Sequence, residues 1–134
     1  MKHPMLETVV ALAERTGKVF VVTASAAGLP HLAGARRFAL LPDGLVRVAD
    51  WFCPTTASNL GENLHVALVV WDGATGEGYQ VLGVVQAERT AAMLDGYEPS
   101  AERGGVQAER ELTVRVDKIL AFSEVPHEDE AVLI

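Results

Sequence analysis

The segment 51–71 constrains the fold most, because it joins the end of one apolar strand to the whole of another through a short helix. Pro54 begins the expected helix, since proline is favoured in a first helical turn. Three hydroxyl side chains follow it, namely Thr55, Thr56 and Ser58. The apolar run 65–71 then predicts a strand without alternation, whereas residues 18–25 are too continuously apolar for a strand with a wet face, so we expect both faces of that strand to be covered.

This helix start has two interpretations. Its unpaired backbone N–H groups and the positive end of the helix dipole, with hydroxyls beside them, can hold a phosphate. The same residues can also cap a helix without any ligand, which is the commoner use of serine and threonine at this position. Both interpretations stay open from these residues alone.

The rest of the chain predicts one amphipathic helix and a series of strands. Apolar residues at helical spacing favour a helix over 5–15, with Gly17 at the position of a C-terminal cap. Gly83, inside an apolar run, indicates a β-bulge or a close backbone approach. Turn residues separate the β-branched runs. The expected strands cover residues 18–25, 31–40, 45–50, 65–71, 79–89 and 111–122.

The C-terminal third is harder to assign. Residues 90–106 are charged and contain several glycines, so we expect a partly helical start followed by a loop. The loop 96–108 and the acidic tail 124–134 are expected to be flexible, although the apolar end 131–134 can dock on a neighbour. Hairpin-connected strands with one helix at the start and one between strands three and four fit a small antiparallel barrel of a single domain, 1–134. Strands with so few polar positions imply that a second subunit covers part of it.

Charge and cysteine content narrow the function. The formal net charge is -7, with 18 acidic against 11 basic side chains. Such a surface repels nucleic acid phosphates and anionic lipids, so neither is an expected partner. Cys53 is the only cysteine, which excludes an internal disulfide and suits a reducing compartment. The sequence contains neither an apolar run that could span a bilayer nor the pattern of a signal peptide, so we expect a soluble, cytoplasmic protein.

Few residues carry a recognisable catalytic pattern. The four histidines are far apart in the sequence, so no metal site is expected. They are His3, His31, His65 and His127. Cys53 lies just before the helix start, where a thiolate would be stabilised, but no histidine stands in an obvious partner position. A packed thiol is therefore favoured over a reactive one.

Three other features together describe a pocket. Arg36 and Arg37 form the only adjacent basic pair, in a strand expected beside the one that leads to Pro54. A guanidinium and the hydroxyls of the helix start could converge on one phosphate. Trp51 and Phe52 could supply an aromatic wall, and Gln80 could bring an amide to a heterocycle. An anionic end and an aromatic end suit a nucleotide-like cofactor.

The order of these motifs resembles the pyridoxamine 5'-phosphate oxidase-like superfamily of FMN-binding split barrels, and more closely its small single-domain FMN-binding proteins. The resemblance covers roughly residues 6–89 and rests on three stretches in order. They are VVTASAAGLPHLAGARR, RVADWFCPTTASNLGENLHVALVVW and GYQVLGVVQ. It implies a mainly β fold, a six-stranded antiparallel split β-barrel with an N-terminal helix and a short helix between strands three and four. It also implies a homodimer with FMN at the interface.

The resemblance also implies cofactor-binding residues. The phosphate would be held from the second strand and from the helix start, the backbone at the end of the third strand would lie along the flavin ring, and a glutamine would face the ring. Matched to this sequence, these are Gly34, Ala35, Arg36, Arg37, Thr55, Thr56 and Ser58 for the phosphate, Val48, Ala49, Asp50 and Trp51 along the ring, and Gln80 facing it.

The sequence departs from the family in two places. Many relatives have lysine or arginine at the helix start, where this chain has Thr55, and the C-terminal Arg-and-His substrate motif of true pyridoxamine 5'-phosphate oxidases is missing. We therefore expect no vitamin B6 oxidation. The implied function is a flavin-dependent oxidoreductase or flavin reductase using NAD(P)H and an unknown small-molecule redox substrate. The alternatives are a non-catalytic module for flavin, a deazaflavin or haem, with His31 or His65 as axial ligand, and a cofactor-free dimeric barrel.

Overall fold

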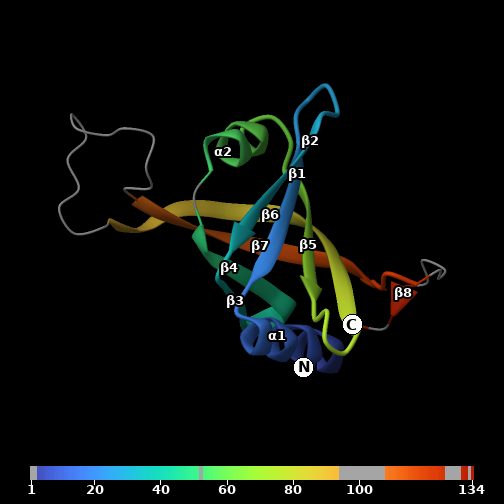
Figure 1. Ribbon diagram of the computed structural model, residues 1–134. Helices are drawn as coiled ribbons and strands as arrows, with labels where there is room; N and C mark the ends of the chain where they lie inside the picture. The colour runs from blue at the N-terminus through green and yellow to red at the C-terminus, as the bar shows by residue number, and fades with distance from the viewer. Residues whose placement is uncertain (1–2, 52, 94–107, 126–130, 133) are drawn as a thin grey trace.

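The computed structural model describes residues 3–51, 53–93, 108–125, 131–132 and 134 (Figure 1). Two α-helices, α1 (Pro4–Thr16) and α2 (Pro54–Leu60), flank a sheet of eight strands. A short 3-10 turn, Pro42–Gly44, precedes β4. The strands are β1 (Val19–Ala24), β2 (Pro30–Ala35), β3 (Arg37–Leu40), β4 (Leu45–Trp51), β5 (His65–Trp71), β6 (Gly78–Met93), β7 (Ala108–Ala121) and β8 (Ala131–Val132).

The sheet is antiparallel throughout and curls on itself. Its strand order is β2-β1-β5-β6-β7-β4-β3, and β8 pairs with β7 outside this path. Although β2 and β3 are consecutive in sequence, they stand at opposite ends of the sheet, and β2 also contacts β4. The two ends of the sheet therefore meet, as the curvature in Figure 1 shows. This confirms the predicted mainly β split barrel with its two helices.

The predicted number of six strands is wrong. The expected strand 31–40 is two strands, β2 and β3, because the chain bends at Arg36 and changes its pairing partner from β1 to β4. Residues 30–35 pair with β1, and after the bend residues 37–40 pair with β4. The short β8 adds the eighth strand.

Two predictions for the C-terminal third need correction. Residues 90–93 are not helical but extend β6, because the ladder with β7 continues to the pair Met93 and Ala108. The apolar end of the tail docks on its own chain, where Ala131 and Val132 pair with β7 and the Ile134 carbonyl accepts a bond from Met5 N. The rest of the predicted loop and tail, 94–107, 126–130 and 133, lies outside the described residues.

Helices α1 and α2 lie at opposite ends of the barrel (Figure 1). The amphipathic α1 buries Leu6, Val9 and Leu12 against the barrel core, which is formed by the inward side chains of the strands. It ends at Gly17, whose φ of 76° gives the left-handed cap that glycine accommodates without strain. One end of the barrel is thus closed by apolar packing of α1, with Arg15 at the end of this helix paired to Asp72 and Glu77.

Gly83 confirms both parts of its prediction. The pairing of β6 with β7 shifts register between Leu82 and Gly83, and the two backbones approach closely there. A Cβ built on Gly83 would collide with the backbone carbonyl of Arg115 and lie 2.7 Å from Val114 Cγ1. The bulge therefore depends on a residue without a side chain.

We expect Gly83→Ala to lower the free energy of unfolding by about 2–3 kcal/mol, since a β7 backbone atom cannot move aside cheaply. Chemical denaturation followed by circular dichroism measures the loss. Gly34→Ala is the matched control, because a Cβ on that strand glycine meets nothing within 4 Å. Equal stability of the two variants would contradict the close approach of β6 and β7.

Candidate functional site

The end of β4 has an irregular backbone next to the start of α2. A β-bulge lies between Ala49 and Trp51, and Asp50 takes a φ of 62°, which is rare for a residue with a side chain. The Asp50 carboxylate forms an ion pair with Arg37 Nε on β3. The Arg37 side chain is still 75% exposed, so much of its guanidinium faces solvent. This pair links the start of β3 to the end of β4.

The other residues predicted to lie along the flavin ring, and Arg36, have different surroundings from those of Asp50 and Arg37. Val48, Ala49 and Trp51 are buried, with Trp51 only 2% exposed, so their side chains belong to the core and do not face a ligand. The Trp51 indole N–H is buried and has no hydrogen-bond partner among the described residues. Phe52, the second half of the predicted aromatic wall, lies outside those residues. Ala35 is buried, Gly34 is exposed, and Arg36 lines, together with Arg37, a cavity of about 320 Å³ against the end of α1.

The hydroxyls of α2 point to different environments. Thr56 is 0% exposed, and its Oγ1 lies 3.4 Å from His31 Nδ1 on β2. Thr55 and Ser58 are exposed. The N-cap position belongs to Cys53, which makes no side-chain cap bond. The simple capping interpretation of these hydroxyls is therefore wrong, and only Thr55 and Ser58 face outward to a ligand.

His31 also lies beside the cysteine. Its Nε2 is 3.9 Å from Cys53 Sγ, so one imidazole contacts both the thiol and the Thr56 hydroxyl. The sequence offered no local signal for this contact, because 21 residues separate His31 from Cys53 in the chain. Only the antiparallel pairing of β1 with β2 and the packing of α2 on both strands bring them together.

A buried polar pair attaches α2 to the barrel. Asn59 Nδ2 donates to Thr23 Oγ1 on β1 at 3.0 Å, and the two residues are 6% and 2% exposed. Thr23 stands opposite His31 in the β1–β2 ladder. The bond therefore fixes α2 relative to the strand pair that carries His31.

Within one chain, Gln80 is distant from the residues around α2. It is on β6, between Val69 of β5 and Leu120 of β7. Val84, four residues further along β6, pairs with His65 at the start of β5, which follows α2. Four residues of strand span roughly 13 Å. Burial raises the pKa of the neighbouring Tyr79, whose phenol donates to Glu77 at 3.2 Å.

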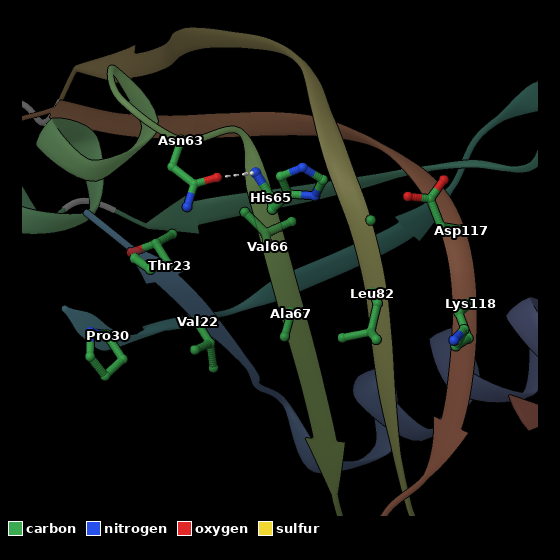
Figure 2. Close-up of a pocket in the computed structure, with 12 residues that line it drawn as sticks. Val22, Thr23, Pro30, Asn63, His65, Val66, Ala67, Leu82, Asp117 and Lys118 are labelled. Atoms are coloured by element: carbon green, nitrogen blue, oxygen red, sulfur yellow. Dashed lines mark hydrogen bonds between the residues drawn. The ribbon is translucent and has the colours of Figure 1, made fainter. Parts of the chain in front are cut away.

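A cavity of about 460 Å³ opens on the outer face of β1, β5 and β6, and Leu82, two residues after Gln80 on β6, lines it. Figure 2 shows Val22, Ala67 and Leu82 side by side on its floor, from β1, β5 and β6. Asp117 and Lys118 both line it, because the register shift opposite Leu82 and Gly83 places two β7 residues there. The cavity is therefore mainly apolar with a charged wall.

A second hollow continues this apolar face. It has a volume of about 250 Å³, and Leu32, one of its lining residues, is 59% exposed. Its full lining is Phe20, Leu32, Val69, Trp71 and Phe122. Together with the larger cavity it forms one apolar outer face over β2, β1, β5 and β6.

Two further properties concern the described residues as a whole. No group of three or more His, Cys, Asp or Glu side chains among them is placed to hold a metal ion. No helix in the same part of the chain is long and apolar enough to cross a membrane.

Solved structures share this architecture. An FMN-binding protein from Syntrophomonas wolfei matches with a TM-score of 0.67 and 16% identity, over 92% of this chain and 89% of its own. A Clostridium acetobutylicum protein related to general stress protein 26 of Bacillus subtilis, of the pyridoxinephosphate oxidase family, matches with a TM-score of 0.65 and 16% identity, over 100% and 97%. HupZ of Group A Streptococcus matches with a TM-score of 0.63 and 20% identity, over 88% of this chain and 94% of its own.

Proteins of other specificity share the fold as well. An F420 reductase matches with a TM-score of 0.57 and 17% identity, over 81% of this chain and 93% of its own. HutZ, the heme storage protein from Vibrio cholerae, matches with a TM-score of 0.56 and 15% identity, over 90% of this chain and 95% of its own. No family model matches the sequence, and no curated protein does. The chain thus has the split-barrel fold of the pyridoxamine 5'-phosphate oxidase-like, FMN-binding proteins.

We expect Thr23→Val to destabilise the protein by about 1–3 kcal/mol, because the Asn59 amide would stay buried without its acceptor. Denaturant titration measures the change. Thr23→Val combined with Asn59→Leu should recover part of the loss, since neither polar group then remains. A double variant that loses the full sum of both single effects would show that the bond does not couple α2 to β1.

Proposed function

We propose that the protein binds FMN between two copies of the chain and acts as a flavin-dependent oxidoreductase or flavin reductase. The observation that carries the proposal is the separation of the predicted binding residues within one chain. Arg37, Thr55 and Ser58 lie around the end of β4 and the start of α2, whereas Gln80 lies along β6 beside an apolar outer face. A second copy is the simplest way to bring both groups to one ligand.

The end of β4 has donors suited to a phosphate. Thr55 and Ser58 present exposed hydroxyls. The ion pair with Asp50 engages the Nε of Arg37, so the other N–H donors of this guanidinium can bind a phosphate. Thr56, in contrast, is occupied by His31. These residues fit a phosphate group, and in our proposal they hold it in place of the lysine or arginine that many relatives have at the helix start.

The outer face has the features of a subunit interface and a ring site. Its apolar side chains span four strands, and an exposed Leu32 lies within it. Apolar surface of this extent on a chain of net charge -7 favours burial against another copy, since monomers seldom leave such patches open. Gln80 then supplies an amide to the ring of a flavin held mainly by the partner subunit.

The residues of the chain would orient and shield the cofactor. When bound, FMN supplies the hydride and electron transfer, with NAD(P)H as the proposed donor. Leu82 and Ala67 exclude water from the ring side of the site, while the Lys118 ammonium beside them can attract an anionic substrate. We place this chemistry in the reducing cytoplasm, where a single cysteine remains a thiol.

One observation favours a second candidate. His65 lines the outer-face cavity (Figure 2), so an imidazole is available there to a haem, the ligand named for HutZ. Binding of a deazaflavin, as the name of the F420 reductase indicates for that protein, would use the same apolar face. The absorption spectrum of the purified protein, with identification of any released molecule, distinguishes these ligands from FMN.

Thr55→Arg is expected to strengthen FMN binding about tenfold, because a guanidinium at the helix start adds a charge-assisted bond to the phosphate. Fluorescence titration with FMN and with riboflavin measures it. Riboflavin is the matched control, since it has the ring and no phosphate, and its affinity should stay unchanged. An FMN affinity that does not rise would overturn the assignment of the phosphate to this turn.

Leu82→Asp is expected to convert the proposed dimer into monomers and to abolish FMN binding, because a carboxylate would be buried at the centre of the apolar face. Light scattering after size exclusion measures the mass. Leu64→Asp is the control, because Leu64 is 48% exposed and lies in a different hollow, beside α2. A monomeric wild-type protein that still binds FMN would rule out the shared site.

A further inference from the structure

Three side chains from separate parts of the chain meet beneath α2. They are His31 of β2, Cys53 at the N-cap of α2 and Thr56 in its first turn. We propose that Cys53 is a reactive thiol, activated by His31, whose substrates are small neutral hydroperoxides. This goes beyond the proposed flavin function and does not rest on it.

The contacts match the arrangement of an activated nucleophile. Cys53 Sγ lies 3.9 Å from His31 Nε2, and Thr56 Oγ1 lies 3.4 Å from His31 Nδ1. In the tautomer that donates its Nδ1–H to Thr56, Nε2 has a lone pair for the thiol proton. A nucleophile, a base and a third group that orients the base are the features shared by histidine-activated thiols. Thr56 is a positioning residue here.

The surroundings hold this geometry. Thr56 is 0% exposed, so its hydroxyl cannot rotate into solvent. Asn59, less than one helical turn later, is bonded to Thr23, which stands opposite His31 across the β1–β2 ladder. The helix carrying Cys53 and the strand carrying His31 are therefore attached to the same residue of β1. A contact that depended on two loose surface chains would lack this support.

Access and charge select the electrophile. Cys53 and His31 are both half-buried, which favours a small molecule at the sulfur. The net charge of -7 disfavours anionic oxidants. A hydroperoxide is small and neutral. Because Cys53 is the only cysteine, the oxidised sulfur cannot close a disulfide within the chain.

The step balances with the hydroperoxide as oxidant. His31 Nε2 takes the Cys53 proton, and the sulfur attacks the terminal oxygen of R–O–O–H, so an S–O bond forms while the O–O bond breaks. The leaving RO⁻ takes a proton from His31 and departs as an alcohol, or as water when R is hydrogen. Sulfur is oxidised to sulfenic acid and the peroxide is reduced. An external thiol then restores Cys53 through a mixed disulfide.

The test is the rate at which hydrogen peroxide oxidises Cys53 at pH 7, with the sulfenic acid trapped by dimedone and counted by mass spectrometry. The single cysteine makes this signal unambiguous. We expect the folded protein to react about tenfold faster than the urea-unfolded chain, and His31→Asn to fall back to about the unfolded rate, because its thiol has lost the base. A folded protein no faster than the unfolded one would overturn the proposal.

Further variants separate activation from simple packing. Thr56→Val should lose most of the enhancement and Thr56→Ser should keep it, because serine retains the hydroxyl that orients His31. His3→Asn, which removes an imidazole at the N-cap of α1, should react like the wild type. If His31→Asn does not fold, as judged by circular dichroism, the valine and serine pair decides. Equal rates for that pair, or an undiminished rate in folded His31→Asn, would disprove the role of His31.

Discussion

The bend at Arg36 is the constraint on which the rest of the structure depends. There the chain leaves its pairing with β1 and begins pairing with β4, so a single run of ten residues serves both ends of the sheet. This closure curls the sheet into a barrel and gives it an inside for the apolar residues of the strands. It also sets where β4 must end. The bulge at Asp50, its ion pair with Arg37 and the start of α2 all follow within a few residues.

The two ends of the barrel have different roles because they are closed differently. Helix α1 seals one end with leucine and valine side chains, which leaves little chemistry there. Helix α2 covers the other end with a short polar turn, which the buried bond between Asn59 and Thr23 attaches to β1 and Leu60 anchors in the core. Buried polar side chains of α2 are tolerated at that end because they have partners, as Thr56 does with His31 and Asn59 with Thr23. Candidate chemistry is therefore concentrated under α2.

The sequence predicts an element correctly where the residues of that element determine its structure by themselves. Pro54 marked the start of α2, the continuous apolar run 65–71 has the same bounds as β5, and Gly83 marked the bulge. The break at Arg36 has no such signal, because neither proline nor glycine occupies that position and the cause is pairing with a distant strand. The helical expectation for 90–93 failed for the same reason, since the ladder to β7 overrides local composition. The contact between His31 and Cys53 also needs the assembled barrel.

Neighbouring residues of α2 can serve two separate purposes, namely binding of an anion and positioning of His31 beside Cys53. Successive residues of a helix are separated by about 100° around its axis, so Thr55 and Thr56 cannot face the same way. Thr55 is exposed and Thr56 is fully buried against His31. A substitution on the outer side alters what approaches from solvent or from a second copy, while one on the inner side alters the imidazole and the thiol. Binding of an anion and reactivity of Cys53 can thus vary independently, although all the side chains concerned on this helix and its N-cap lie within the six residues 53–58.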